Sequence, residues 1–354
     1  MRGIAWLTCA LAAIALLTSC SQGAAPATSA ASAKPAASAG TAAKPKEMTT
    51  LRVATQTNQG DFGYLPLWIA VQQGYLKDEG IQLQYVTMQQ SASIAALLNH
   101  EIDISADTSR PASQGAPAKN FMWYYNTTTF QFSVSPEIQK PQDLLGKAVG
   151  IASPGATQDK ATRLIIEKAL GLDPNKVQYH PLGSPQARIA AMEAKQIVGS
   201  ANNPDVAALL ETMGYKTIAN SAKVMPVPFS PLGAHTDLFK DKPEMLKSFL
   251  KANLRAAKFL HDNPEESAKI AGGFAKDLAP GVALRAVQLD LGAMDANDYL
   301  GATQDGLQLD ANAIKDEQSL ATPPGLDALS NVAPLRAAQK ELGLSCAGGW
   351  KCDH

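Results

Sequence analysis

The sequence predicts an α/β protein built from two doubly wound domains with a ligand cleft between them. A strand, a loop, a helix and a second strand follow one another over residues 51–86. The same order returns several times from residue 147 onward, and 354 residues are enough for two ordinary domains. Repeated units of this kind form mainly parallel sheets with helices on both faces. We therefore expect two such sheets, each covered by helices.

The opening unit carries the signals of a β-α-β unit. LRVAT alternates apolar and polar residues, and the polar loop TNQGDFGY after it cannot continue a strand. LPLWIAVQQ then places Leu65, Trp68 and Ile69 on one side at helical spacing. Gly74 suits a C-terminal cap, and IQLQYV alternates again. The first loop should lie at the carboxyl edge of a parallel sheet, beside a helix N-terminus that attracts anionic or polar ligands.

The later segments supply the remaining elements. Residues 91–99 predict a helix and residues 102–106 a short apolar strand, and KNFMWYYN and TTTFQFSVS follow as strand-like segments. From Lys147, three further α/β units follow, and the helix in DKATRLIIEKALG should end at Gly171. VMPVPFSPLGAHTDLF is extended and proline-rich, which fits a return crossover. The remainder is predicted to be helical.

Two blocks of the chain resemble a known family. PLWIAVQQGYLKDEGIQLQYV is similar to a block of the sulfonate-, taurine- and nitrate-binding proteins of ABC importers, a family that includes relatives of the thiamine-pyrimidine synthases. QKPQDLLGKAVGIASPGAT resembles a second block of that family, and the resemblance covers roughly residues 51–277. It implies a periplasmic-binding-protein fold of type II with two hinge crossovers. The first domain would then be discontinuous, residues 49–130 and 225–354, and the second, residues 131–224, would be inserted into it.

The N-terminal segment predicts an exported, lipid-anchored protein. Residues 1–19 contain one positive charge and an apolar run that is too short for a bilayer span, as in a secretory signal peptide. The segment ends in LTSC, which resembles the lipobox of bacterial lipoproteins and implies a diacylglycerol on Cys20; the alternative is an ordinary signal with a chance cysteine. Residues 20–48 are mostly Ala, Ser, Pro, Gly, Thr and Lys and predict a flexible linker.

Two cysteines remain beyond the signal and the lipidation site. Cys346 and Cys352 are close in an exported chain, which suggests a disulfide that closes the C-terminal tail. Two free thiols are the alternative. We expect no metal site, because His354 is the only nearby histidine among five scattered ones.

Charge and motifs exclude several functional classes. The formal net charge is −1 and the basic residues are scattered, so nothing indicates a nucleic-acid partner. The sequence has no Gly-x-Ser-x-Gly, Walker loop or Cys-x-x-Cys, and it lacks the cysteine-rich iron-binding run of the synthases in the resembled family. We expect a monomeric binding protein without a cofactor, not an enzyme.

The candidate ligand-binding residues lie on loops that converge if the two domains face each other with the carboxyl edges of their sheets. Ser91 and Ser153 have an alternative role as helix caps, and Phe62 and Tyr64 as core residues. Trp123, Tyr124 and Tyr125 are expected in a hinge or the core, with ligand stacking as the alternative. The candidates are Asn58, Gln59, Asp61, Phe62, Tyr64, Gln90, Ser91, Asp107, Thr108, Arg110, Ser153, Gly155, Ala156, Thr157, Asn202, Asn203 and Asp205.

Arg110 decides the predicted ligand. A planar guanidinium beside a cleft can bind a carboxylate or sulfonate through two hydrogen bonds, whereas the alternative is a surface salt bridge with Asp107. We therefore expect a small organic anion, aromatic or not, delivered to an ABC permease and its ATPase. The alternative ligands are nitrate, a pyrimidine or an amide, because loop residues rather than the fold set specificity. The alternative function is a ligand-sensing module outside transport.

Overall fold

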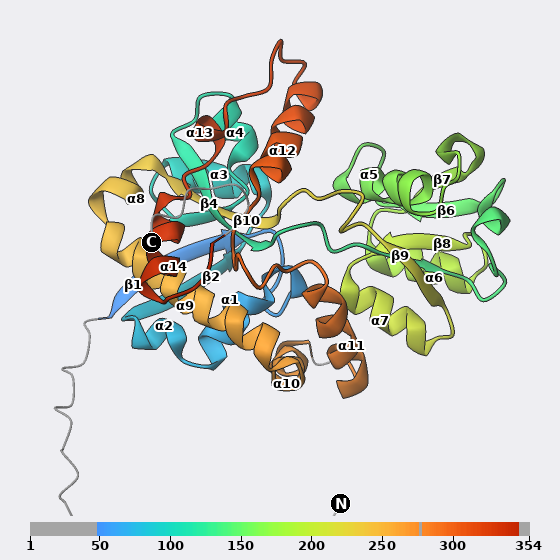
Figure 1. Cartoon of the computed structure of the whole chain (residues 1–354), viewed down its shortest axis with the longest axis horizontal. Coiled ribbons are helices and arrows are strands. Elements are labelled where there is room, and N and C mark those ends of the chain that lie inside the picture. The colour runs from blue at the N-terminus through green and yellow to red at the C-terminus, as the bar shows by residue number, and fades with distance from the viewer. Residues whose placement is uncertain (1–47, 276–277, 347–354) are drawn as a thin grey trace, which may run out of the picture. The chain divides into compact units, whose positions relative to one another are not determined.

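The computed structural model describes residues 48–275 and 278–346, which belong to one compact unit, Lys46–His354. These residues form two five-stranded sheets surrounded by helices (Figure 1). The strand order is β2-β1-β3-β10-β4 in the first sheet and β7-β6-β8-β5-β9 in the second. The predicted signal segment, Cys20 and nearly all of the predicted linker lie outside the described residues, as does Cys352.

The first sheet combines strands from two distant parts of the chain. β1 pairs in parallel with β2 and β3, while β10 pairs antiparallel with β3 and β4. Alternation places Leu51 and Val53 of β1 in the core without solvent exposure, as predicted. The strands are β1 (Thr49–Thr55), β2 (Ile81–Thr87), β3 (Ile104–Ala106), β4 (Ala118–Tyr125) and β10 (Phe229–His235).

The second sheet has the same mixed pattern. β6 is parallel to β7 and β8, and β5 is antiparallel to β8 and β9. The expectation of mainly parallel sheets is therefore confirmed, with one reversed strand in each sheet, β10 in the first and β5 in the second. β5 and β10 are the strands at which the chain enters the other sheet, so each runs against its neighbours. The strands are β5 (Gln131–Val134), β6 (Ala148–Ile151), β7 (Gln178–Pro181), β8 (Gly199–Asn202) and β9 (Lys216–Asn220).

Two segments carry the chain between the sheets, residues 126–130 and residues 221–228, which we call the crossing segments. They contact each other directly. The buried Thr128 hydroxyl lies 2.8 Å from the Ser221 hydroxyl and donates to the Met225 carbonyl at 2.9 Å. The second crossing segment contains part of the proline-rich stretch in which a return crossover was expected.

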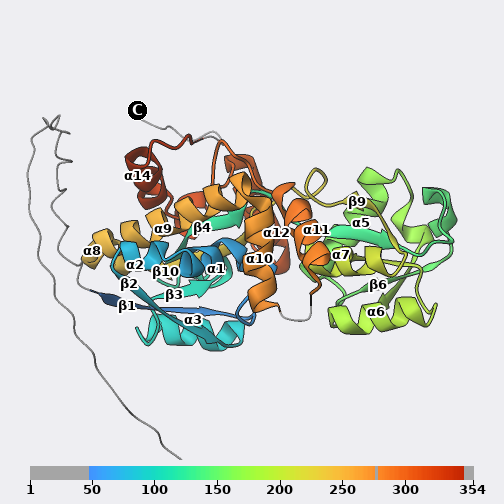
Figure 2. The same cartoon turned by 90° about the horizontal axis from the view of Figure 1, so that it is seen from below.

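Helices cover both faces of the first sheet, and Figure 2 shows α3 on the face opposite to α1 and α9. In α1, Trp68 and Ile69 are buried as predicted, and Gly74 after the helix has the left-handed conformation, φ 73°. The central α9 buries apolar residues at spacings of three and four, including Leu246, Phe249 and Leu250. The helices are α1 (Leu65–Gln72), α2 (Tyr75–Asp78), α3 (Gln90–Leu98), α4 (Ser109–Ser113), α8 (Thr236–Asp241), α9 (Pro243–Asp262), α10 (Pro264–Phe274), α12 (Gln304–Glu317), α13 (Leu326–Leu329) and α14 (Ala333–Glu341).

The second sheet is covered by α5 (Thr157–Leu164), α6 (Pro185–Glu193) and α7 (Pro204–Thr212). α5 continues into a π-helical turn, Ile165–Ala169, before Gly171. α11 (Pro280–Leu291) packs on both α10 and α7, so the C-terminal part of the chain contacts helices of both sheets. Short 3-10 turns occur at Phe62–Tyr64, Pro141–Leu144 and Pro174–Lys176. Among the described residues, no helix is both long and apolar enough to cross a bilayer.

Candidate functional site

A cavity of about 320 Å³ lies between the two sheets. Its lining comes from the loops that follow β1 and β3, from the starts of α5 and α7, from both crossing segments and from α12. Strand ends and helix starts are therefore brought together from both sides, as expected for loops at the edges of α/β sheets. The lining residues are Gln56, Thr57, Asp61, Gly63, Tyr64, Ala106, Asp107, Arg110, Trp123, Thr128, Thr129, Thr157, Lys160, Asn203, Pro204, Met225, Val227, Pro228, Phe229, Ser230, Pro231, Asp310, Ala313 and Glu317.

Six of the seventeen candidate residues line this cavity: Asp61, Tyr64, Asp107, Arg110, Thr157 and Asn203. They come from both sheets, so the structure joins loops that are up to 142 positions apart in the chain. The predicted convergence of loops from both sheets is therefore present at this cavity.

Eleven candidates do not line the cavity, and several have structural contacts instead. Thr108 is fully buried, where its backbone N–H and its hydroxyl both donate to the Asn120 side chain at 2.8 and 2.9 Å. Asn202 is also fully buried and donates to the Ser200 carbonyl. Gln90 donates to the Asp107 carbonyl at 2.6 Å and so holds the loop behind the cavity. The other eight are Asn58, Gln59, Phe62, Ser91, Ser153, Gly155, Ala156 and Asp205.

The structure shows which of the alternative roles the predicted serines and aromatic residues have. Neither Ser91 nor Ser153 is the N-cap of the helix that it was expected to start. Phe62 is buried in the core, and Tyr64 belongs to the same core and also lines the cavity. Trp123 also lines the cavity, while the two tyrosines after it are fully buried in the first sheet, where their hydroxyls donate to the Asn253 side chain and the Phe62 carbonyl.

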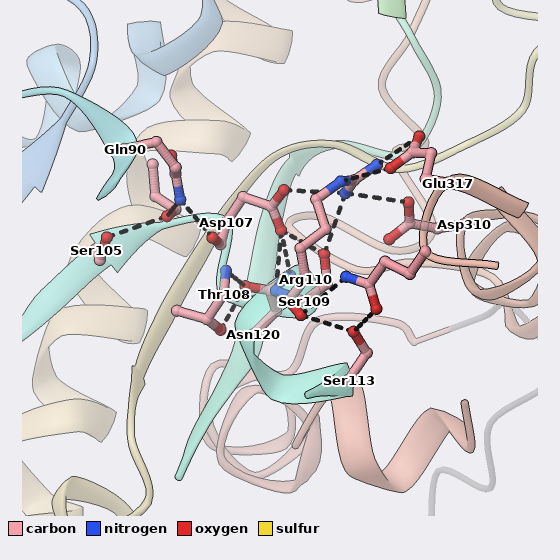
Figure 3. A network of polar contacts seen from close by, with 12 residues as sticks. Gln90, Ser105, Asp107, Thr108, Ser109, Arg110, Ser113, Asn120, Asp310 and Glu317 are labelled. Atoms are coloured by element: carbon pink, nitrogen blue, oxygen red, sulfur yellow. Dashed lines mark hydrogen bonds and ion pairs between the residues drawn. The ribbon is translucent and has the colours of Figure 1, made fainter. Parts of the chain in front are cut away.

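Arg110 lies in the cavity lining, where it contacts the carboxylates of three residues (Figure 3). Its Nε and Nη2 donate to the two oxygens of Glu317 at 3.0 and 3.3 Å. Its Nη1 is 3.1 Å from Asp107 and 3.6 Å from Asp310. The expected alternative, an ion pair with Asp107, is therefore present. The full set of partners also includes two α12 carboxylates that the sequence did not indicate.

The loop that presents Asp107 and Arg110 is fixed from several sides. Asp107 has a positive φ of 31°, which is unusual for a residue other than glycine. Its carboxylate accepts from the Ser109 backbone N–H at 3.0 Å and from the Asn120 side chain at 3.3 Å. These bonds, drawn in Figure 3, hold the backbone in that conformation at the cavity wall.

Burial and like charge raise the pKa of two lining carboxyls. Burial is the main cause that raises the pKa of Asp61 to about 6, and the negative charge of Asp205 adds to it. Burial likewise raises the pKa of Asp310 to about 6, with Asp107 as the next cause, although Arg110 acts in the opposite direction. Burial, the main cause of both shifts, disfavours a charge of either sign, and the like charges of Asp205 and Asp107 add repulsion.

Lys160, Asp310 and Glu317 line the cavity but were not predicted. Lys160 lies one helical turn after Thr157 on α5, which is the signal that could have identified it. Its Nζ is 2.6 Å from Glu317, so this ion pair joins α5 to α12. Asp310 and Glu317 belong to α12, beyond residue 277 where the family resemblance ends, and no sequence signal linked them to the site.

One group of side chains outside this cavity could hold a metal ion. His100, His235 and Asp237 offer ligand atoms that all lie within 4.8 Å of one another. The two histidine rings are 4.5 Å apart between centroids, although they were treated as scattered residues in the sequence. Elsewhere, Cys346 is disulfide-bonded, while its predicted pairing with Cys352 involves a residue outside the described part and stays a prediction.

Two mixed α/β sheets joined by two crossing segments, with a cavity between them, define the fold class of periplasmic binding proteins. The putative periplasmic sulfonate-binding protein SsuA from Methylobacillus flagellatus has this fold, with a TM-score of 0.64 at 17% identity over 86% of this chain and 100% of that chain. The aliphatic sulphonate-binding protein SsuA from Escherichia coli gives 0.62 at 13% identity over 86% and 96%. The predicted fold class is therefore confirmed.

A match of a family model to the sequence identifies the family of this chain. The "NMT1/THI5 like" family model matches residues 61–267, more than half of the chain, and the chain belongs to this family, which confirms the resemblance. No curated protein matched the sequence. The fold also occurs in an enzyme, since the desulfurization enzyme DSZB gives a TM-score of 0.58 at 14% identity over 83% of this chain and 99% of that chain.

Proposed function

We propose that this chain is the substrate-binding component of an ABC importer, which captures a small polar organic molecule and delivers it to a membrane permease. The observation that carries the proposal is the cavity lined by both sheets and by both crossing segments. Rotation about two adjacent crossing segments would open and close such a cavity without disturbing either sheet. Similarity to solved sulfonate-binding proteins supports the same role.

The proposed division into domains follows the two sheets. Residues 49–130 and 225–354 would form the first domain and residues 131–224 the second, with the crossing segments as hinges. The Thr128–Ser221 contact, 2.8 Å long, would keep the two hinges together during movement. A binding protein of this kind needs no catalytic group, and we propose that the ligand is released unchanged.

Thermal-shift screening with a metabolite panel tests the binding role. A ligand at 100 times its dissociation constant should stabilise the protein by about 2.7 kcal/mol. Mass spectrometry of the ligand after incubation then separates a binding protein from an enzyme of the same fold. A hit that is chemically converted contradicts the proposal, whereas a hit recovered intact supports it.

We further propose that Cys20 carries the lipid anchor and that the linker up to residue 48 leaves the cavity free to reach the permease. The linker, about 28 residues at roughly 5–6 Å times the square root of its length, would separate its ends by about 30 Å. Incorporation of labelled fatty acid into the expressed protein tests this proposal. We expect no label in a Cys20→Ala variant, and equal labelling of parent and variant contradicts the anchor.

The expected anionic ligand depends on Arg110 as its partner. In the structure both Nε and Nη2 of this guanidinium bond to Glu317, and these are the groups that would otherwise form a paired contact with a ligand carboxylate or sulfonate. Arg110 therefore has a carboxylate of the protein at the edge that a ligand anion would use.

A further inference from the structure

The charges that line the cavity are unequal. The lining contains four carboxylates, Asp61, Asp107, Asp310 and Glu317, but only two cationic side chains, Arg110 and Lys160. At neutral pH the formal charge of the wall is therefore negative. An anionic ligand entering such a wall is repelled unless a cationic group is available to meet it.

Both cationic side chains already contact carboxylates. Arg110 is surrounded by Glu317, Asp107 and Asp310 at distances from 3.0 to 3.6 Å. Lys160 lies 2.6 Å from Glu317, which therefore contacts both cations of the lining. The Nε and Nη2 edge of Arg110, which would form a paired contact with a ligand anion, is occupied by Glu317, and Lys160 shares that carboxylate. The two cationic side chains thus offset the repulsion among the carboxylates of the cavity lining.

Asp61 stands apart from this network. One of its oxygens accepts from the Gly63 backbone N–H at 2.8 Å, and no lysine, arginine or histidine in the described part of the chain forms an ion pair with it. The charge that acts on its pKa is that of another carboxylate, Asp205 at the start of α7. A cation in the cavity would relieve this repulsion, and the two cationic side chains of the lining pair with other carboxylates.

The uncharged residues of the cavity lining suit an organic ion with an apolar part better than a hydrated metal ion. Three aromatic residues, Tyr64, Trp123 and Phe229, line the cavity together with apolar residues of the second crossing segment. Aromatic faces attract ammonium and amidinium groups as well as apolar surface. An aromatic wall beside acidic side chains is therefore complementary to an organic cation with an apolar part.

We propose that the cavity binds a small organic cation, an ammonium or amidinium compound, with Asp61 and Asp310 as the carboxylates that receive its charge. This inference rests on the proposed function, since it names the ligand class of the same site. Asp61 contributes from the loop after β1 and Asp310 from α12, so the charged group is approached from two separate segments.

Two matched series of compounds test the charge of the ligand. Benzamidine, benzamide and benzoate share a ring, while propylamine, butyramide and propane-1-sulfonate share a propyl chain, and each series runs from cation through neutral compound to anion. We expect the cations to raise the melting temperature of the purified protein in a concentration-dependent way, and the anions to leave it unchanged. Anions that bind better than or as well as the cations overturn the charge inference but leave the binding function intact. If no member of either series and no member of a broad metabolite panel binds, both proposals fail.

Charge-neutralising variants locate the contact. Asp61→Asn and Asp310→Asn should each weaken binding of the best cationic probe by about 30-fold or more, as measured by isothermal titration calorimetry. Asp327→Asn is the matched control, because it removes the same charge from an exposed residue outside the cavity, and it should bind as the parent does. Circular dichroism establishes that each variant is folded. If the two cavity variants bind as tightly as the control, these carboxylates do not receive the ligand.

Discussion

At the scale of single residues, Arg110 illustrates how partners decide what a charged side chain can do. Its position after β3 was enough to predict that it would lie beside the cleft. Its chemistry depends on Glu317 and Asp310, which are about 200 positions further along the chain. Once these carboxylates surround it, the arginine organises the wall and is no longer free to bind an anion.

Glu317→Gln should reverse this arrangement. The variant removes one negative charge and leaves Arg110 and Lys160 without their shared partner, so we expect affinity for benzoate to rise by about 10-fold, or about 1.4 kcal/mol. Affinity for benzamidine should fall. Calorimetry measures both, and Glu137→Gln, an exposed residue outside the cavity, is the matched control. Equal affinities of variant and control for both probes contradict the role given to Glu317.

The raised carboxyl pKa values predict a pH-dependent stability. Burial raises the pKa of Asp61 to about 6, above the ordinary aspartate value of 3.8, so between these values the folded state binds more protons than the unfolded state. The contribution of this group to the free energy of unfolding therefore falls as the pH rises from about 4 to above 6. The facing groups are Asp205 and the Gly63 N–H, and neither supplies a positive charge.

Asp61→Asn removes this titration. Relative to the parent, the variant should gain stability between pH 5 and pH 7.5, by about 1 kcal/mol, since one pKa unit corresponds to about 1.4 kcal/mol and the side chain keeps some solvent contact. Urea unfolding at the two pH values gives the difference. The pKa of other carboxylates, such as Asp103 and Glu341, is lowered, so their contribution to the free energy of unfolding changes with pH in the opposite direction. This contribution is the same in parent and variant and cancels in the comparison. A variant that shows no change with pH contradicts the shift.

At the scale of elements, the sequence was most informative where the determinants are local. α1 has its proline in the first turn and its left-handed glycine after the last turn, both readable from adjacent residues. The direction of β5 and β10 was not readable, because it depends on the chain crossing between sheets. α12 was expected only as a helix, and nothing in its own pattern shows that Asp310 and Glu317 meet Arg110.

A pair of glycine substitutions tests the local determinants. Gly74 has a φ of 73° and open space around an added Cβ, so Gly74→Ala should cost about 1 kcal/mol through backbone strain alone. Gly272 lies within α10, also with open space, and Gly272→Ala should stabilise by roughly 0.5–1 kcal/mol. Chemical denaturation measures both. Equal effects of the two substitutions contradict the role of Gly74 as a helix-ending residue.

At the scale of the whole described unit, function depends on contacts between segments that no local pattern links. The cavity needs both crossing segments, the starts of α5 and α7, and α12. Repetition of α/β units predicted that two sheets would be present and that their loops would converge. It did not identify the ion pair between Lys160 and Glu317, which joins α5 to α12 at the cavity.

Lys160 allows the electrostatic and structural roles of this contact to be separated. Both side chains of the pair are about one third exposed, 36% and 33%, so its loss in Lys160→Gln should change the free energy of unfolding by less than about 1 kcal/mol. The same substitution removes one of the two cations from a cavity wall that is already acidic. We therefore expect benzamidine to bind a few-fold more tightly, and more so at low salt, where charges are less screened. Lys168→Gln, on an exposed lysine outside the cavity, is the control. Weaker benzamidine binding by Lys160→Gln than by this control would show that the ion pair positions the walls, and that its positive charge does not oppose the ligand.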